Sequence, residues 1–201
     1  NPRDSNFSYG AIGSGLTLQS IHQMIPIIRS LNAMNGAAML RAFGGGEFIK
    51  DFDLSTEWLK KSDLKPKEKE AIFEGIKHHH IQAEPAKWLD LISSETKGGE
   101  KDSMLPLGVG QTIYDWAAAD YVAAGEWIQR QDESPIKLHA VGRYIDIISG
   151  FEPKVAAEWL ETLPTNHEDH KRLATHLYGS LRYDDPEAAA AFAEKYDLKT
   201  E

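Results

Sequence analysis

The sequence predicts an all-α protein made of stacked antiparallel helical hairpins that form a short α-solenoid. Apolar residues recur at helical spacing along most of the 201 residues. No segment alternates in the way that β-strands do. An Ala-rich stretch with one aromatic residue recurs towards the C-terminus, which is typical of a repeat architecture. We therefore expect about ten short helices in a right-handed array.

The recurring stretch keeps a fixed spacing. An acidic residue stands seven positions before an aromatic residue in each of three copies. We expect the acid to cap a helix, a task for which Asp is better suited than Glu, and the Pro that follows it in two copies suits a first helical turn. Alanines then allow close approach to a neighbouring helix. The three pairs are Asp120 and Trp127, Glu152 and Trp159, and Asp185 and Phe192.

A second helix precedes each acid. Apolar residues stand four, seven and eleven positions before it, and these offsets trace one face of an α-helix. Each unit is therefore predicted to be an apolar-faced helix, a tight turn and an Ala-rich helix. Because one hairpin cannot bury its own face, the hairpins should stack. The apolar stripe comprises Val109, Ile113 and Trp116 in the first unit, Val141, Ile145 and Ile148 in the second, and Ala174, Tyr178 and Leu181 in the third.

These units resemble the tetratricopeptide-like class of α-helical hairpin repeats. They are similar to those of bacterial repeat proteins with "D-P-x-A-A-x-W"-type units, here "YDDPEAAAAF" and "GFEPKVAAEW". The resemblance covers about 108–198 well and 53–107 loosely, and the standard "W-x-x-L-G-x-x-Y" opening is not present. It implies a tetratricopeptide-like superhelix whose concave face binds peptides or proteins, and it implies no catalytic residues.

The repeat pattern also predicts the domain organisation. Residues 1–15 are interpreted as a flexible lead-in, and residues 16–201 as a single helical repeat domain with clear repeats at 108–198 and degenerate ones at 53–107. The polar segment 93–106 is expected to be an inserted mobile loop.

Proline and glycine punctuate the helices expected over residues 16–43. Pro26 is predicted to break a helix or to begin one. "NAMNG" (32–36) is predicted to be a turn. Gly44–Gly46 are expected to end the next helix through positive-φ freedom.

The composition excludes several function classes. The net charge of −9 disfavours a nucleic-acid groove and anionic lipid as partners. The absence of cysteine excludes disulfides, thiol catalysis and cysteine-bound metals. No apolar run approaches the roughly 20 residues that span a bilayer. Because the sequence begins at Asn1, we expect a processed or trimmed N-terminus and a bacterial envelope or periplasmic location, with the cytoplasm as the alternative.

Two histidine clusters are candidate metal sites. His78–His80 follow Glu74, but three consecutive histidines on a helix point about 100° apart and cannot all hold one ion. "HEDH" (167–170) lacks the HExxH spacing, and Thr165 or Asn166 is expected to cap the next helix. We therefore predict packing or solvated helix starts at both places, with no metal and no cofactor.

Glycine and tryptophan patterns also favour structural roles. The glycine-rich stretches 10–15 and 107–112 follow no strand and lack the P-loop lysine, so we expect tail flexibility and a helix entry. Four tryptophans stand at repeat positions predicted to face the hairpin core, which disfavours a carbohydrate platform. They are Trp88, Trp116, Trp127 and Trp159.

Polar residues beside the apolar stripe are the candidate partner-binding residues, because neighbouring repeats cover the stripe itself. Gln111, Arg143 and His176 each stand two residues after a stripe residue at the same offset, so we expect them to form a ladder on one surface. Arg143 should be its strongest point through charge-assisted hydrogen bonds. Further arginines at similar places could hold carboxylates, although pairing within the chain is the favoured alternative. These arginines are Arg130, Arg172 and Arg182.

The sequence thus predicts a non-enzymatic helical-repeat scaffold that binds a protein or peptide, with its oligomeric state left open. The alternative is an all-α hydrolase or lyase acting on glycans in a polar central cavity. A deep pocket with two or more convergent carboxylates or histidines would favour catalysis. An open groove lined by Arg, Tyr and Asn would favour binding. No catalytic residue is predicted.

Overall fold

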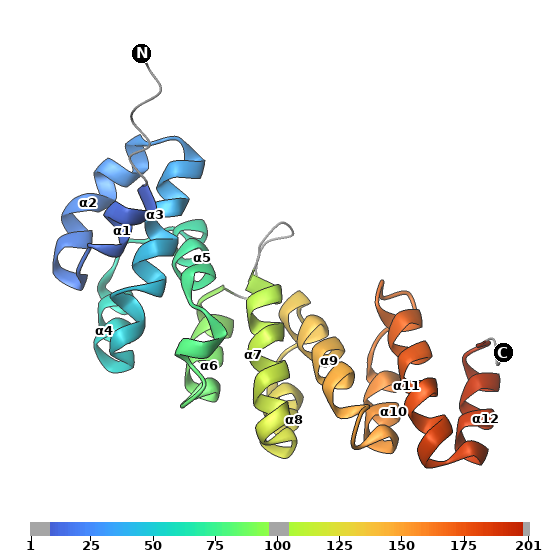
Figure 1. The fold of residues 1–201 in the computed structure, drawn as a ribbon. Helices are drawn as coiled ribbons and strands as arrows, with labels where there is room; N and C mark the ends of the chain where they lie inside the picture. Colours follow the sequence, from blue (N-terminus) through green and yellow to red (C-terminus); the bar gives the residue numbers. More distant parts are fainter. Residues whose placement is uncertain (1–8, 97–104, 199–201) are drawn as a thin grey trace. The chain divides into compact units, whose positions relative to one another are not determined.

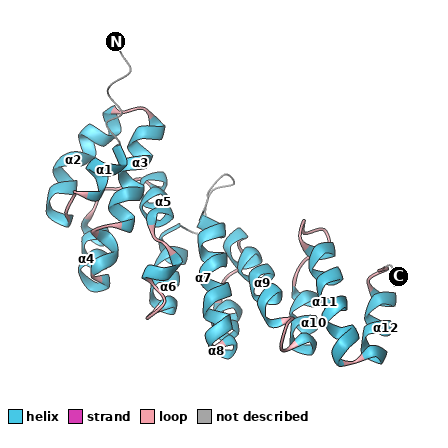
Figure 2. Cartoon of the chain, in the orientation of Figure 1, coloured by secondary structure: helices cyan, strands magenta, loops and turns pink. Residues whose placement is uncertain are grey.

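A computed structural model of the chain describes residues 9–96 and 105–198, and in the segment 105–107 its backbone alone. These residues form twelve α-helices and two 3-10 turns, η1 and η2, and within them no strand occurs (Figures 1 and 2). The prediction of an all-helical chain is confirmed. The chain divides into two compact units, residues 1–108 and 109–201, and each is described by itself.

Unit 1 contains six α-helices and both 3-10 turns. Their bounds are α1 (Tyr9–Ser14), α2 (Leu18–Ser30), α3 (Ala33–Gly45), η1 (Phe48–Lys50), α4 (Phe52–Lys61), α5 (Pro66–Gly75), η2 (His78–His80) and α6 (Pro85–Thr96). Helix α3 contacts α1, α2 and α5, and α5 also contacts α6. Helix α3 is therefore the centre of this unit (Figure 1).

Glycine permits the close crossing of α3 and α5. A Cβ atom on Gly44 would lie 1.9 Å from the carbonyl oxygen of Ile72, and one on Gly75 would lie 1.9 Å from that of Arg41. Neither glycine has a positive φ angle, and α3 continues to Gly45. Gly44–Gly46 were expected to end the helix through positive φ angles, whereas Gly44 instead permits close backbone packing against α5.

The N-terminal region is more helical than expected. Residues 9–14 of the predicted lead-in form α1, whose Gly13 packs against the backbone of Met39, while residues 1–8 lie outside the described part. Helix α2 runs through Pro26 without a break. Asn32 caps α3 by accepting a hydrogen bond from the backbone N–H of Asn35, so the stretch 32–36 begins a helix where a turn was expected.

An aromatic cluster forms the core of unit 1 around Phe48. This ring is fully buried, and its centroid lies 5.9 to 6.0 Å from those of four other rings. The surrounding residues are Phe43, Trp58, Phe73 and Trp88. The expected core position of Trp88 is confirmed, and Trp58, for which no core position was predicted, is buried in the same cluster.

Unit 2 contains the residues of the clear repeats. Its helices are α7 (Leu105–Ala119, from Val109 on), α8 (Tyr121–Arg130), α9 (Pro135–Ile148), α10 (Pro153–Thr162), α11 (His170–Asp184) and α12 (Pro186–Lys195). Helix α9 contacts α8, α10 and α11, and α11 contacts α10 and α12. Of the expected loop 93–106, residues 93–96 belong to α6 and residues 105 and 106 to α7, while residues 97–104 lie outside the described part.

The three copies have the same local geometry. Helices α8, α10 and α12 each contain ten residues, with the aromatic residue at the seventh position. The backbone N–H of each acid donates to the carbonyl four residues earlier, at 2.6 to 2.7 Å. Asp120 and Asp185 also accept a helix-capping hydrogen bond at 3.0 Å, whereas Glu152 does not. The expected advantage of Asp over Glu is therefore confirmed.

A fourth copy of this helix lies in unit 1. Helix α4 also has ten residues, an acidic cap at Asp51 and an aromatic residue, Trp58, seven positions later. The Asp51 side chain accepts a hydrogen bond from the backbone N–H of Leu54 at 2.9 Å. The segment 53–107, expected to be degenerate, thus contains one regular element.

The apolar stripe of unit 2 is largely buried. Seven of its nine residues are buried, whereas Trp116 and Tyr178 are partly exposed. Trp127 is fully buried, while Trp159 keeps partial exposure and contacts the Tyr144 ring with a 4.8 Å centroid separation. Trp116 and Trp159 are therefore less enclosed than the prediction required.

Candidate functional site

The candidate site in unit 2 is organised by the carboxylate of Asp146 on α9. Arg172 of α11 binds it with two hydrogen bonds of 2.8 and 3.1 Å, and Arg143 of α9 donates to it at 3.2 Å. His176 Nδ1 lies 3.9 Å from the same carboxylate. Side chains from α9 and α11 thus converge on one acidic group, and we call these four residues the Asp146 cluster.

Exposure differs between the acid and its partners. The Asp146 side chain is only 11% exposed, whereas those of Arg143 and Arg172 are 32% and 52% exposed. The acid therefore lies beneath the two guanidinium groups and leaves their outer edges accessible to solvent. A shared carboxylate also offsets the repulsion that would otherwise separate two arginines.

Arg172 is the more fully occupied arginine. Its Nε donates to Asp169 at 2.8 Å in addition to the two bonds to Asp146. Hydrogen bonding to Asp146 and then to Asp169 raises the pKa of Arg172 further above its ordinary value. With Asp169 included, the positive charges of Arg143 and Arg172 are balanced by the negative charges of Asp146 and Asp169.

Arg143 has unused hydrogen-bonding capacity. A guanidinium carries five N–H donors, and the bond to Asp146 takes one of them. The guanidinium also stacks on Tyr114 of α7, with 4.8 Å between its central carbon and the ring centroid. Helix α7 comes close here because Gly110 faces His139 and Arg143, and a Cβ atom on Gly110 would lie 2.5 Å from the His139 ring. Tyr114 therefore holds the Arg143 guanidinium from one side, and Asp146 holds it from the other.

Ser149 joins His176 to the cluster. Its hydroxyl donates to the backbone carbonyl of Asp146 at 3.1 Å and lies 3.3 Å from His176 Nδ1. Ser149 thus links the His176 imidazole to the backbone of Asp146.

The structure brings together some of the predicted binding residues. Arg143, Arg172 and His176 belong to the Asp146 cluster, so pairing within the chain, the favoured alternative, accounts for both arginines. Gln111 lies on the adjoining α7 and donates to Asp115 at 3.0 Å. These four residues lie on α7, α9 and α11, the helices that precede the Ala-rich helices α8, α10 and α12.

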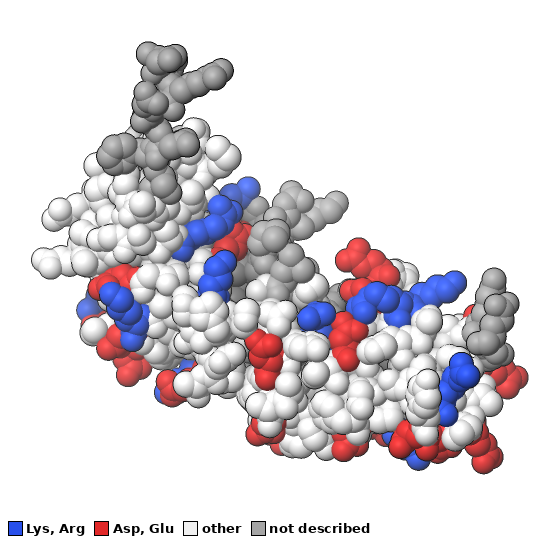
Figure 3. Space-filling model, in the orientation of Figure 1, with Lys and Arg blue, Asp and Glu red and all other residues white. Residues whose placement is uncertain are grey.

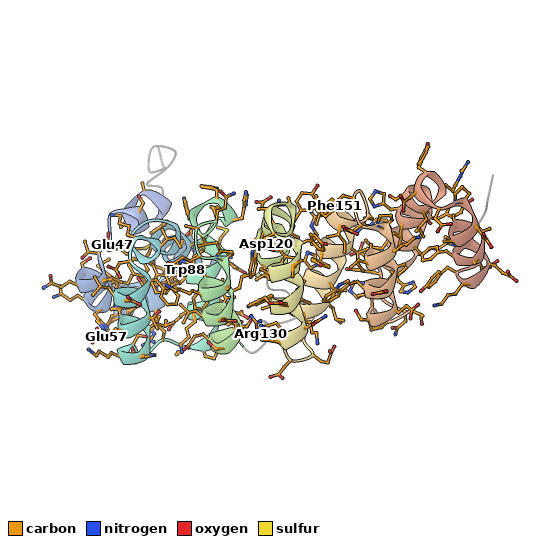
Figure 4. All side chains as sticks on the ribbon, turned by 90° about the horizontal axis from the view of Figure 1, so that it is seen from below. Glu47, Glu57, Trp88, Asp120, Arg130 and Phe151 are labelled. Atoms are coloured by element: carbon orange, nitrogen blue, oxygen red, sulfur yellow. The ribbon has the colours of Figure 1, made fainter. Side chains whose placement is uncertain are left out.

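The remaining two arginines lie elsewhere. Arg130 ends α8, at the opposite end of that helix from Asp120 (Figure 4). Arg182 lies near the end of α11, where its guanidinium is 5.7 Å from the Tyr178 ring centroid. Within the described residues, neither arginine forms an ion pair with the Asp146 cluster.

Sequence reasoning missed Asp146 and Tyr114. Asp146 follows Arg143 by three residues, a spacing that places both on one helix face, so the local pair could have been found. The contacts to Arg172 and Tyr114 bridge separate helices and follow from the packing of α7, α9 and α11.

The histidine clusters lead to no metal site. His78–His80 form η2, with His79 and His80 exposed, and the nearby Glu74 binds Arg41 at 2.7 Å. In "HEDH", Asp169 stands at the N-cap position of α11, which replaces the expected Thr165 or Asn166, and His170 is buried against Tyr196. Among the described residues, no group of three or more His, Asp or Glu side chains is arranged to hold a metal ion.

A recess in unit 1 bears on the enzymatic alternative. It has a volume of about 530 Å³ between α2, α3 and α5, and three glutamates line it. A hydrogen bond from Arg29 lowers the pKa of Glu68, and Glu74 is paired with Arg41. A general acid needs a raised pKa, so the Arg29 pairing opposes that role for Glu68. The three glutamates are Glu68, Glu70 and Glu74.

Comparison with known proteins adds no functional evidence. No helix in the described ranges combines the length and apolar character that crossing a membrane requires. Neither the family models nor the curated proteins nor the solved structures provide a match for this chain.

Proposed function

We propose that unit 2 is a short solenoid of tetratricopeptide-like hairpins and a non-enzymatic scaffold for a protein or peptide partner. The equivalent capped helices and the direct contact between α9 and α11 support this architecture. The partner segment lies across α7, α9 and α11, where Arg143, Arg172 and His176 bind it, with Gln111 at the adjoining position.

The observation that carries this proposal is the shared Asp146 carboxylate. It fixes two guanidinium groups from successive hairpins before a partner arrives. Orienting a long side chain on binding costs about 0.5–1.5 kcal/mol, so this arrangement reduces the entropic cost of association. Asp146 thus acts as a positioning residue for the two arginines.

The chemistry of the cluster favours a partner that presents a carboxylate. Arg143 can form a bidentate pair with a carboxylate through donors that Asp146 does not use. Asp169 balances part of the charge on Arg172, so Arg143 contributes most of the attraction. An acidic side chain or the C-terminus of a peptide would satisfy this requirement.

A peptide selection tests the proposal. The full chain is immobilised and screened against a random peptide library, and the selected peptides are measured by fluorescence polarisation. Removing Arg143 in Arg143→Ala should weaken binding by about 10- to 100-fold, the value of one or two charge-assisted hydrogen bonds. Arg130→Ala is the matched control, because Arg130 lies on α8 outside the Asp146 cluster.

The outcomes are distinct. Enrichment of carboxylate-bearing peptides that Arg143→Ala binds poorly and Arg130→Ala binds normally supports the proposal. Failure to select any peptide, or equal binding by both variants, contradicts it. The melting temperature of Arg143→Ala should fall by no more than about 4–8 °C, because a partly exposed pair contributes at most about 1 kcal/mol.

A further inference from the structure

Two exposed aromatic side chains lie at the hairpin turns of unit 2, outside the Asp146 cluster. Phe151 follows α9 and is 48% exposed, and Tyr183 lies near the end of α11 and is 95% exposed. Tyr121 contacts the Phe151 ring edge-on with 5.7 Å between centroids. Phe151 is therefore anchored on one side, while both rings remain available to a ligand.

A recess of about 370 Å³ lies between these two rings. Its size falls at the lower end of the range for small-ligand pockets, roughly 300–1,000 Å³. The lining combines aromatic, hydroxyl and carboxylate groups. It includes Phe151, Pro153, Ser180, Tyr183 and Asp184.

The charge around the recess is negative. Acidic side chains, with a few basic ones among them, lie where α11 joins α12 (Figure 3). In the sequence, Asp184 and Asp185 stand at this junction. Lys154 binds Asp185 at 2.9 Å, which leaves the exposed Asp184 as the carboxylate of the recess. A negative wall beside two ring faces is complementary to a cation.

We propose that this recess binds an arginine side chain of a partner segment. Its guanidinium lies against the face of Phe151 or Tyr183 and donates a bidentate pair of hydrogen bonds to Asp184. Arginine suits the site better than lysine because its planar group can stack and bond to the carboxylate at the same time. This second site uses none of the four residues of the Asp146 cluster, which binds the opposite charge, and Ser149 lies between the two sites.

The test is an NMR titration of the full chain with the peptide acetyl-Gly-Arg-Gly-amide. Resonances of Phe151, Tyr183 and Asp184 should shift, with a dissociation constant of about 1 mM, as expected for one side chain. The citrulline peptide, which keeps the shape without the charge, should bind at least about tenfold more weakly. Tyr183→Ala and Asp184→Asn should each reduce affinity about two- to tenfold.

Controls separate this inference from the proposed function. Asp132→Asn, an acidic position outside the recess, and Arg143→Ala should bind the arginine peptide like the unmodified chain. Equal binding of the citrulline peptide would overturn the inference. So would unchanged affinity in both recess variants, or binding of a neutral oligosaccharide in place of the arginine peptide.

Discussion

The substitution Gly44→Ala adds one methyl group at the closest crossing in unit 1. The new Cβ atom would lie 1.9 Å from the carbonyl oxygen of Ile72 and 2.8 Å from its carbonyl carbon. Both obstacles are backbone atoms of α5, so no side-chain rotation relieves the clash. Helices α3 and α5 must separate by at least about 1.5 Å to restore ordinary contact.

The stability cost follows from this separation. Overpacking a close-packed interior costs about 1–3 kcal/mol, and the value should lie at or above the upper end because the backbone itself must move. Unit 1 has roughly 100 residues, for which 1 kcal/mol lowers the melting temperature by about 4–8 °C. We therefore expect a melting temperature at least about 12 °C lower for the part of the transition that reports on unit 1.

The assay combines thermal denaturation with hydrogen exchange. Exchange of the α3 and α5 amides locates the loss in unit 1, which a single global melting curve cannot do. Gly179→Ala is the matched control: Gly179 lies in α11, and an added Cβ atom meets nothing within 4 Å. This control should be neutral or stabilising by up to about 1 kcal/mol. A Gly44→Ala chain as stable as the unmodified protein would refute the close-crossing argument.

Three further predictions concern capping, buried hydroxyls and pH. Glu152→Asp should stabilise α10 by up to about 1 kcal/mol in urea denaturation, because Asp can form the cap that Glu152 lacks; no gain would contradict the equivalence of the copies. Ser55→Ala should lower the free energy of unfolding by about 1–3 kcal/mol, because the Ser55 hydroxyl donates to a buried carbonyl. Thr56→Val should be neutral or stabilising, because the Thr56 hydroxyl is buried without a partner. Burial lowers the pKa of His139 and of His170 from 6.5, so the unfolded chain binds protons more readily than the folded chain. The free energy of unfolding should therefore fall as the pH drops below about 6.5. A urea midpoint that is unchanged or higher at pH 5.5 than at pH 7.5 would contradict this.

Local sequence features predicted the repeat well. The spacing from Asp120 to Trp127 predicted a capped helix, which the structure confirms as α8, because capping and helical periodicity depend on neighbours along the chain. The same rule applied to Asp51 would have recovered α4 as a regular copy. These elements needed no knowledge of tertiary contacts.

Tertiary packing decided what the sequence did not reveal. Gly13 and Gly44 indicated flexibility or helix ends, yet each permits a close contact with a helix distant in the sequence. The candidate site likewise depends on contacts between helices that are distant in the sequence. Arg143 was identified from its offset, but Tyr114 and Arg172 join it only because α7, α9 and α11 pack together.

The most direct test of the binding surface is an NMR map of arginine side chains in the full chain. The Nε–Hε signals of Arg143 and Arg172 are followed while a selected carboxylate-bearing peptide is added. The account predicts that these two signals shift together, with those of Arg130 and Arg29 unchanged, because only the first pair belongs to the Asp146 cluster. Shifts confined to Arg29, Arg41 or Arg130, with Arg143 unaffected, would contradict it.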